Sequence, residues 1–310
     1  MNKLQKIGFT LSSVALSGMM LAGCSNTPNS PGSSSGTNDT SNQTSSSTGS
    51  SASGKTITIG YVNWDEDVAT SYLWKDLLSS KGYNVDLKTL EAGPLFAGLS
   101  EGGVDVFFDT WLPTTHKTYM DHYGSQLTSL GKWYQGQTEE GFVVPSYVKD
   151  VNTIADLKTH ASEFGNQIVG IDPGAGEMGL AGKAVSDYGL NLKLVQSSSP
   201  AMLSSLEKAY KAHQPIVVTL WSPHWAFAKY RLKYLSDPKG DFGKPGWIQT
   251  EANTKWVNAN PQVAGWIKNF KLTPKQLGTL EEDINNASSK DAGVKQWITD
   301  NQSLVNGWFK

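Results

Sequence analysis

Apolar positions from Thr56 onward alternate between short strand-like runs and the spaced stripes of amphipathic helices. In the first part of the chain the pattern predicts strands at 56–62, 85–90 and 104–109, with helices at 66–80 and 95–100 between them. Alternation of this kind is typical of a mostly parallel sheet covered by helices. We therefore predict an α/β fold.

A second α/β unit begins near residues 141–148. Its predicted elements are a helix at 153–158, a strand at 167–171, a helix ending at 188, a strand at 193–196, a helix at 201–212 and a strand at 216–220. Three helices are predicted beyond the Lys-Pro-Gly of 244–246, at 260–270, 273–285 and 292–309. We predict that residues 56–145 plus 247–310 form lobe I and that 146–246 form lobe II, with a ligand cleft between them.

Residues 1–23 have the pattern of an export signal: Lys3 and Lys6 precede an apolar stretch that is too short to span a membrane. Leu-Ala-Gly-Cys at 21–24 resembles a bacterial lipobox, which implies a lipid on Cys24 and attachment to the cell membrane on its extracytoplasmic face. Residues 24–55 are rich in Ser, Thr, Asn and Gly, and we predict a disordered tether there. Because Cys24 is the only cysteine, intramolecular disulfides are excluded.

Three tryptophans follow strand-like runs: Trp64, Trp111 and Trp221. Ligands of open α/β sheets bind beyond the carboxyl ends of the strands, and a cation is attracted to an aromatic face. We predict that the three indoles form a cage for a quaternary ammonium group. The alternative for each tryptophan taken alone is hydrophobic packing, which we expect for those of the C-terminal region, namely Trp256, Trp266, Trp297 and Trp308.

The turn at 172–179 lies between a predicted strand and a helix, and Gly174, Gly176 and Gly179 match the spacing of a dinucleotide fingerprint. That fingerprint needs an acidic residue after the next strand, and residues 193–199 contain none. Glycines at a helix start also let backbone N–H groups approach a small anion such as a ligand carboxylate. We favour the anion site, and a plain turn is the alternative.

His224 follows Trp221 by three residues, close to the same predicted crevice, and a histidine can donate to a carboxylate. The other histidines, His116 among them, show no metal-ligand spacing, and we expect them at the surface. The acidic run at 65–67 and Asp109 raise the question of an acid/base pair. An acidic run at a helix start more often complements the helix dipole, which we favour. The net charge of −2 and the lack of a basic run argue against nucleic-acid binding.

Three segments together with the lipobox and tether resemble the glycine betaine–binding proteins of ABC osmoprotectant importers: Val62-Asn63-Trp64-Asp65-Glu66, Phe108-Asp109-Thr110-Trp111-Leu112-Pro113 and Trp221-Ser222-Pro223-His224-Trp225. The resemblance implies a two-lobed periplasmic-binding-protein-like (type II) fold that closes on its ligand. It assigns the trimethylammonium cage to Trp64, Trp111 and Trp221, and the carboxylate contacts to His224 and to backbone N–H groups at Gly176 and Glu177.

The resemblance also implies the partners: a small betaine ligand, and a membrane permease powered by a cytosolic ATPase. It implies no catalysis, no cofactor and no metal. The alternatives are a choline or carnitine receptor and, from another class, a secreted glycan-binding or glycan-cleaving protein.

Overall fold

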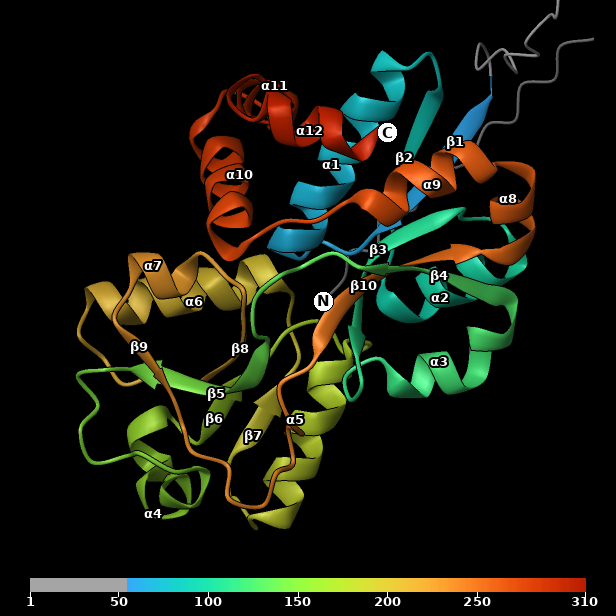
Figure 1. Ribbon diagram of the computed structural model, residues 1–310. Coiled ribbons are helices and arrows are strands. Elements are labelled where there is room, and N and C mark those ends of the chain that lie inside the picture. The colour runs from blue at the N-terminus through green and yellow to red at the C-terminus, as the bar shows by residue number, and fades with distance from the viewer. Residues whose placement is uncertain (1–54) are drawn as a thin grey trace, which may run out of the picture. The chain divides into compact units, whose positions relative to one another are not determined.

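The computed structural model describes residues 55–310, which fold around two separate five-stranded sheets (Figure 1). The first sheet has the order β2-β1-β3-β10-β4, and the second has the order β7-β6-β8-β5-β9. The strands are β1 (Thr56–Tyr61), β2 (Asn84–Thr89), β3 (Val106–Leu112), β4 (Leu127–Lys132), β5 (Glu139–Pro145), β6 (Gln167–Val169), β7 (Lys193–Val195), β8 (Val218–Ser222), β9 (Leu232–Tyr234) and β10 (Trp247–Asn253).

The helices divide between the two sheets according to where they fall in the chain. Around the first sheet the chain forms α1 (Asp65–Ser80), α2 (Ala92–Glu101), α3 (Lys117–Tyr123), α8 (Thr254–Ala259), α9 (Pro261–Asn269), α10 (Pro274–Asn286), α11 (Lys290–Asp300) and α12 (Gln302–Trp308), together with the 3₁₀ turn η1 (Gly124–Gln126). Between strands of the second sheet it forms α4 (Leu157–His160), α5 (Gly176–Asp187), α6 (Ser199–Lys211) and α7 (Ala226–Lys229), with η2 (Ile154–Asp156) and η3 (Ala161–Phe164). We call the two sheets with these helices the first lobe and the second lobe.

The export signal predicted at 1–23, the predicted lipidation at Cys24 and all but the last residue of the tether lie outside the described residues. Within residues 55–310, no helix combines the length and the apolar composition that crossing a bilayer requires.

Both sheets are mixed, so the prediction of a mostly parallel sheet is wrong for this chain. Strands β2, β1 and β3 are parallel, as are β7, β6 and β8. Strand β10 runs antiparallel to β3 and β4, and β5 runs antiparallel to β8 and β9. The antiparallel pairings arise where the chain leaves one sheet for the other and where it returns.

The chain crosses from the first sheet to the second between β4 and β5 and returns between β9 and β10. We call residues 133–138 the outgoing crossing and residues 235–246 the returning crossing. Because β5 pairs within the second sheet, residues 139–145 lie there and not in lobe I, to which the predicted boundary at 145 assigned them. The crossing therefore comes several residues earlier than the sequence pattern indicated.

Alternate residues of β5 belong to different cores, because successive side chains of a strand point to opposite faces. Phe142 and Val144 join the smaller hydrophobic cluster of the second lobe, whereas Val143 joins the large cluster that includes the tryptophans. In the first lobe Trp74 on α1 stacks on Phe108 of β3. The C-terminal helices α10 and α11 pack on α1, as Figure 1 shows in orange and red beside blue.

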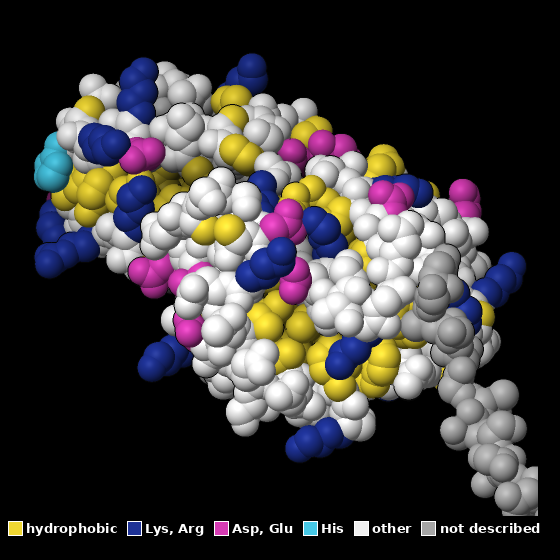
Figure 2. Space-filling view, turned by 90° about the horizontal axis from the view of Figure 1, so that it is seen from above, with side chains coloured by type: hydrophobic (Ala, Val, Ile, Leu, Met, Phe, Trp, Pro, Cys, Tyr) yellow, Lys and Arg dark blue, Asp and Glu magenta, His cyan; other side chains and the backbone are white. Residues whose placement is uncertain are grey.

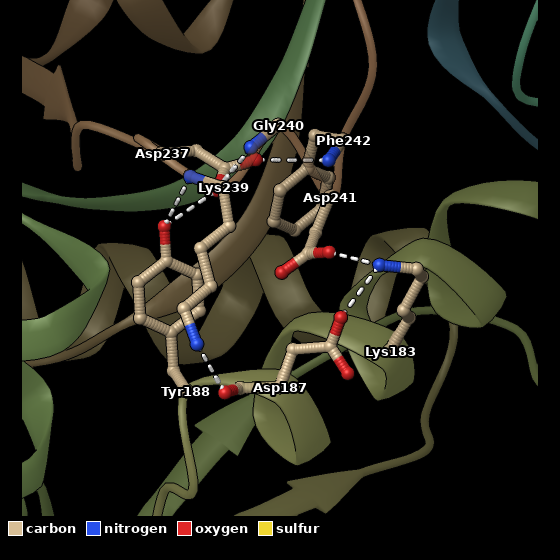
Figure 3. A network of polar contacts seen from close by, with 8 residues as sticks. All are labelled: Lys183, Asp187, Tyr188, Asp237, Lys239, Gly240, Asp241 and Phe242. Atoms are coloured by element: carbon tan, nitrogen blue, oxygen red, sulfur yellow. Dashed lines mark hydrogen bonds and ion pairs between the residues drawn. The ribbon is translucent and has the colours of Figure 1, made fainter.

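A polar network fixes the returning crossing to the end of α5 (Figure 3). Asp237 accepts hydrogen bonds from the Tyr188 hydroxyl at 2.8 Å and from the Phe242 amide at 2.9 Å. Lys183 on α5 pairs with the buried carboxylate of Asp241. The segment that leads back to the first lobe is therefore held to the helix whose other end carries Gly176 and Glu177.

The surface carries both signs of charge. Figure 2 shows Lys and Arg side chains interspersed with Asp and Glu over one face of the described residues. This distribution agrees with the small net charge of −2.

Candidate functional site

A cavity of about 260 Å³ takes its lining residues from both lobes. The lining residues are Trp64, Glu66, Trp111, Thr115, His116, Glu140, Ile171, Ala175, Gly176, Glu177 and Trp221. Five of the residues that the sequence singled out are therefore brought together, and His224 is not in the lining.

The three tryptophans reach the cavity from equivalent places in the fold. Trp64 is the N-cap of α1, three residues after the end of β1, while Trp111 and Trp221 are the next-to-last residues of β3 and β8. Strands β3 and β8 thus run one residue beyond the tryptophans that were predicted to follow them. All three indoles are buried.

Buried carboxyl groups anchor two of the three indoles. Trp111 donates its indole N–H to Asp109 at 2.9 Å, and Trp221 donates to Glu66 at 2.9 Å. The indole N–H of Trp64 has no hydrogen-bond partner within residues 55–310. Two of the three indoles are therefore fixed by polar contacts, and Trp64 by packing.

His116 is buried and lines the cavity, so the surface position expected for it is wrong. Its Nδ1 accepts the backbone N–H of Trp111 at 2.9 Å, which leaves the proton of the neutral ring on Nε2. Burial lowers the pKa of His116 to about 3. The ring stacks on Trp64 with centroids 5.8 Å apart, and its Nε2 has no partner in the described part of the chain. The sequence carried one signal for it, its position five residues after Trp111.

The cavity is also lined by three carboxyl groups, those of Glu66, Glu140 and Glu177. Burial, followed by the charge of Asp109, raises the pKa of Glu66 well above its usual range. Burial raises the pKa of Glu140 to about 7, and the Thr115 hydroxyl donates a hydrogen bond to it. No Lys or Arg of residues 55–310 lines the cavity. The indole faces of this lining favour a positively charged group.

The acidic run at 65–67 does more than complement the dipole of α1. Glu66 reaches the cavity, and Asp67 accepts the backbone N–H of Val62 at 2.7 Å. Asp65 accepts the indole N–H of Trp225 at 2.9 Å from the other lobe. The three residues therefore have three different partners, and two of these lie across the cleft.

Gly176 lies against the opposite lobe. A Cβ at this position would lie 2.1 Å from the carbonyl oxygen of Thr115, closer than any contact that real Cβ atoms make. Beside it, the Tyr119 hydroxyl donates to the carbonyl of Gly174 at 2.7 Å. The glycine turn is thus a point of close approach between the lobes, and α5 begins there, at the cavity.

His224 lies next to Trp221 without lining the cavity. Its ring meets that of Trp221 edge to face at 5.0 Å between centroids. Its Nδ1 accepts the backbone N–H of Ala226 at 3.0 Å, so that its Nε2 faces Asp65 at 3.3 Å. Within residues 55–310, no cluster of three or more His, Cys, Asp or Glu side chains is arranged to hold a metal ion.

Comparison with known proteins points to one family. Residues 55–300 match the model of the family described as the substrate-binding domain of ABC-type glycine betaine transport systems. The chain is 38% identical over 144 residues to the glycine betaine/carnitine transport binding protein GbuC of Listeria monocytogenes, an alignment covering 46% of this chain and 48% of that protein. The matched stretch thus spans about half the length of that relative.

Two solved structures are similar over nearly all of their own length. Lactococcal OpuAC, in a closed conformation complexed with glycine betaine, is 38% identical with a TM-score of 0.77, covering 83% of this chain and 100% of that chain. The glycine betaine/L-proline-binding protein ProX of Borrelia burgdorferi is 30% identical with a TM-score of 0.78, covering 82% and 96%. The two-lobed periplasmic-binding-protein-like fold predicted from the sequence is confirmed.

Proposed function

We propose, from the premise that this chain belongs to the family of substrate-binding domains of ABC-type glycine betaine transport systems, that it captures glycine betaine or a closely related quaternary ammonium zwitterion. The observation that carries the proposal is one small cavity lined by three buried indoles and three carboxyl groups.

The cationic end of the ligand suits the tryptophan cage. Each desolvated cation–π contact contributes about 2 kcal/mol. Two or three charge-assisted hydrogen bonds to a ligand carboxylate contribute about 1.5–3 kcal/mol each. After an association cost of at least ~4 kcal/mol, the balance is near the ~8 kcal/mol of micromolar binding. Such an affinity suits a receptor that must also release its solute.

For the anionic end we propose the backbone N–H groups of Gly176 and Glu177, at the N-terminus of a 12-residue helix. The role predicted for His224 remains a proposal. Its Nε2 carries the proton and faces Asp65, so that a ligand carboxylate would compete with Asp65 for this donor. Loss of betaine affinity in His224→Ala, with choline affinity kept, supports the role, and unchanged betaine binding removes it.

In the cell, we propose that the chain acts outside the cytoplasm, hands its ligand to a membrane permease powered by a cytosolic ATPase, and catalyses no reaction. The lipobox pattern supports attachment through Cys24. Cys24→Ala then releases the protein from the membrane fraction, while ligand binding by the folded part is unchanged.

Isothermal titration calorimetry of the mature chain against a ligand panel tests the proposal. The panel contains glycine betaine, proline betaine, carnitine, choline and a neutral oligosaccharide. We expect micromolar binding of at least one betaine and no heat with the sugar. Tighter binding of choline would make the chain a choline receptor. Binding of the sugar alone would make it a glycan-binding protein and overturn the proposal.

A further inference from the structure

One carboxyl group of the cavity has no partner. Glu177 is 3% exposed and lines the cavity, and neither of its carboxyl oxygens makes a hydrogen bond with any of residues 55–310. The other two carboxyls are partnered, Glu66 by Trp221 and Glu140 by Thr115. A buried polar group without a partner is costly, and at a binding cavity this arrangement points to a partner supplied by the ligand.

The groups around Glu177 disfavour its ionised form. Glu140 on β5 and Glu66 on α1 are acidic, Tyr234 on β9 is a half-buried phenol, and His116 is neutral. Burial, followed by the charge of Glu140, raises the pKa of Glu177 well above its usual range.

Two backbone N–H groups counter this effect only in part. Those of Gly141 and Leu220 lie near enough to the carboxyl group to lower the pKa of Glu177, but burial and the charge of Glu140 outweigh them. No Lys or Arg of the described chain lines the cavity to compensate a negative charge. The neutral acid is therefore the form that fits this site, and a neutral carboxyl group has an O–H to donate.

We propose that the Glu177 side chain binds the ligand as a neutral acid, donating its O–H to the carboxylate of the captured zwitterion. The inference rests on the proposed function and extends it, because it names a side chain that selects between ligands. Glu177 stands in the first turn of α5, where the backbone N–H groups already favour an anion. An ionised Glu177 would repel the ligand carboxylate at that place, whereas the neutral acid adds a donor.

Selectivity then depends on pH. The affinity for glycine betaine is constant while Glu177 keeps its proton, and it falls by up to about tenfold per pH unit once the pH exceeds the pKa of this group. Choline has no carboxylate, so its affinity does not fall over the same range. The receptor therefore prefers the zwitterion most strongly at the acidic end.

Calorimetric titrations of glycine betaine and choline between pH 5 and 9 test the proposal on the mature chain. Glu177→Gln keeps a neutral donor that cannot ionise, so we expect near-parental betaine affinity at pH 5 and a flat profile up to pH 9. Glu177→Leu removes the donor, and we expect about tenfold weaker betaine binding at pH 5 with choline binding unchanged. Thermal melting of each variant checks that it folds.

Two further measurements separate Glu177 from its neighbours. Glu140→Gln removes the group whose pKa is raised to about 7, and we expect the alkaline loss of betaine affinity to remain in this variant and to move to lower pH, because the charge of Glu140 raises the pKa of Glu177. Titrations in buffers of different ionisation enthalpy report proton exchange: above the pKa of Glu177, betaine binding takes up a proton in the parent and none in Glu177→Gln.

The outcomes distinguish this inference from the proposed function. If Glu177→Leu binds betaine as tightly as the parent at pH 5, the role of Glu177 is wrong and the function stands. An affinity that rises with pH and falls in Glu177→Gln would mean that an ionised Glu177 pairs with the ligand cation instead. If the parent binds no betaine at any pH, the proposed function itself fails.

Discussion

Trp221 of the second lobe donates its indole N–H to Glu66 of the first lobe at 2.9 Å. The two residues are 155 positions apart in the chain, and both line the same cavity. Glu66 stands in the first turn of α1, two residues after Trp64, so one short segment carries a cage indole and the acceptor for another. Cage geometry and approach of the lobes are therefore linked through this contact.

Removing the Glu66 carboxyl weakens ligand binding. Glu66→Ala leaves the buried indole N–H of Trp221 without its acceptor, at a cost of about 1–3 kcal/mol, or roughly five- to 150-fold in Kd. Glu66→Gln keeps an acceptor oxygen, and we expect a change within about threefold. Gln249→Ala is the matched control, because Gln249 accepts the indole N–H of Trp247 outside the cavity lining. Parental affinity in Glu66→Ala would show that the contact does not support the site.

The three cage tryptophans differ in their tolerance of phenylalanine. Trp111→Phe and Trp221→Phe replace an indole ring, which attracts a cation most strongly, with a weaker phenyl ring. They also leave a buried carboxyl group without its hydrogen-bond donor. Trp64→Phe weakens only the cation–π contact, because the indole N–H of Trp64 has no partner among residues 55–310. We expect betaine Kd to rise least in Trp64→Phe, with the other two weaker by a further factor of about ten. Equal losses in all three, measured by calorimetry, would contradict the role of the carboxyl anchors.

Gly176 cannot carry a side chain without separating the lobes. In Gly176→Ala the new Cβ meets the Thr115 carbonyl oxygen at 2.1 Å, so the turn must move away from the opposite lobe. We expect betaine affinity to fall by about a hundredfold or more, or about 3 kcal/mol, as for overpacked sites. Gly179→Ala in the same helix is the control, because its Cβ meets no atom within 4 Å. Parental binding by Gly176→Ala would mean that the close approach is dispensable.

Buried Glu281 makes folding stability fall as the pH rises. Burial chiefly raises its pKa from 4.5 to about 8, so between these values the folded state holds a proton that the unfolded state has lost. The stabilisation is fully present below pH 4.5 and is lost as the pH rises through 8. Glu281→Gln should flatten the decline of Tm between pH 5 and 9, followed by circular dichroism. Glu282→Gln, at the exposed neighbouring position, should leave the decline unchanged.

The first three strands and the helices between them were largely predictable, because the sequence signals for these elements are local. The helix predicted at 66–80 is α1 (Asp65–Ser80), and the strand predicted at 85–90 is β2 (Asn84–Thr89). Strand β10, Trp-Ile-Gln-Thr-Glu-Ala-Asn, was missed because it has no apolar run. It is a strand because β3 and β4 provide hydrogen-bonding partners on both of its edges.

As for the fold, the parts of the site that have local sequence signals were predictable. A tryptophan at the end of a strand and a glycine turn before a helix are local features, and they indicated Trp64, Trp111, Trp221 and Gly176. For His116 the only local signal was its position five residues after Trp111, and its burial depends on the amide of Trp111 and the ring of Trp64. A lone histidine in a sequence carries no record of such neighbours.

The sequence by itself determined the six strands that pair in parallel, the placement of three indoles near strand ends and the absence of a side chain at Gly176, because these depend on the chemistry of neighbouring residues. Only the tertiary structure decided which carboxyl groups anchor which indoles, that His116 is buried, and that Glu177 has no partner within residues 55–310. These features are contacts, or missing hydrogen-bond partners, that depend on residues distant in the chain. Their energies depend on burial and geometry, which exist only once the two sheets have been brought together.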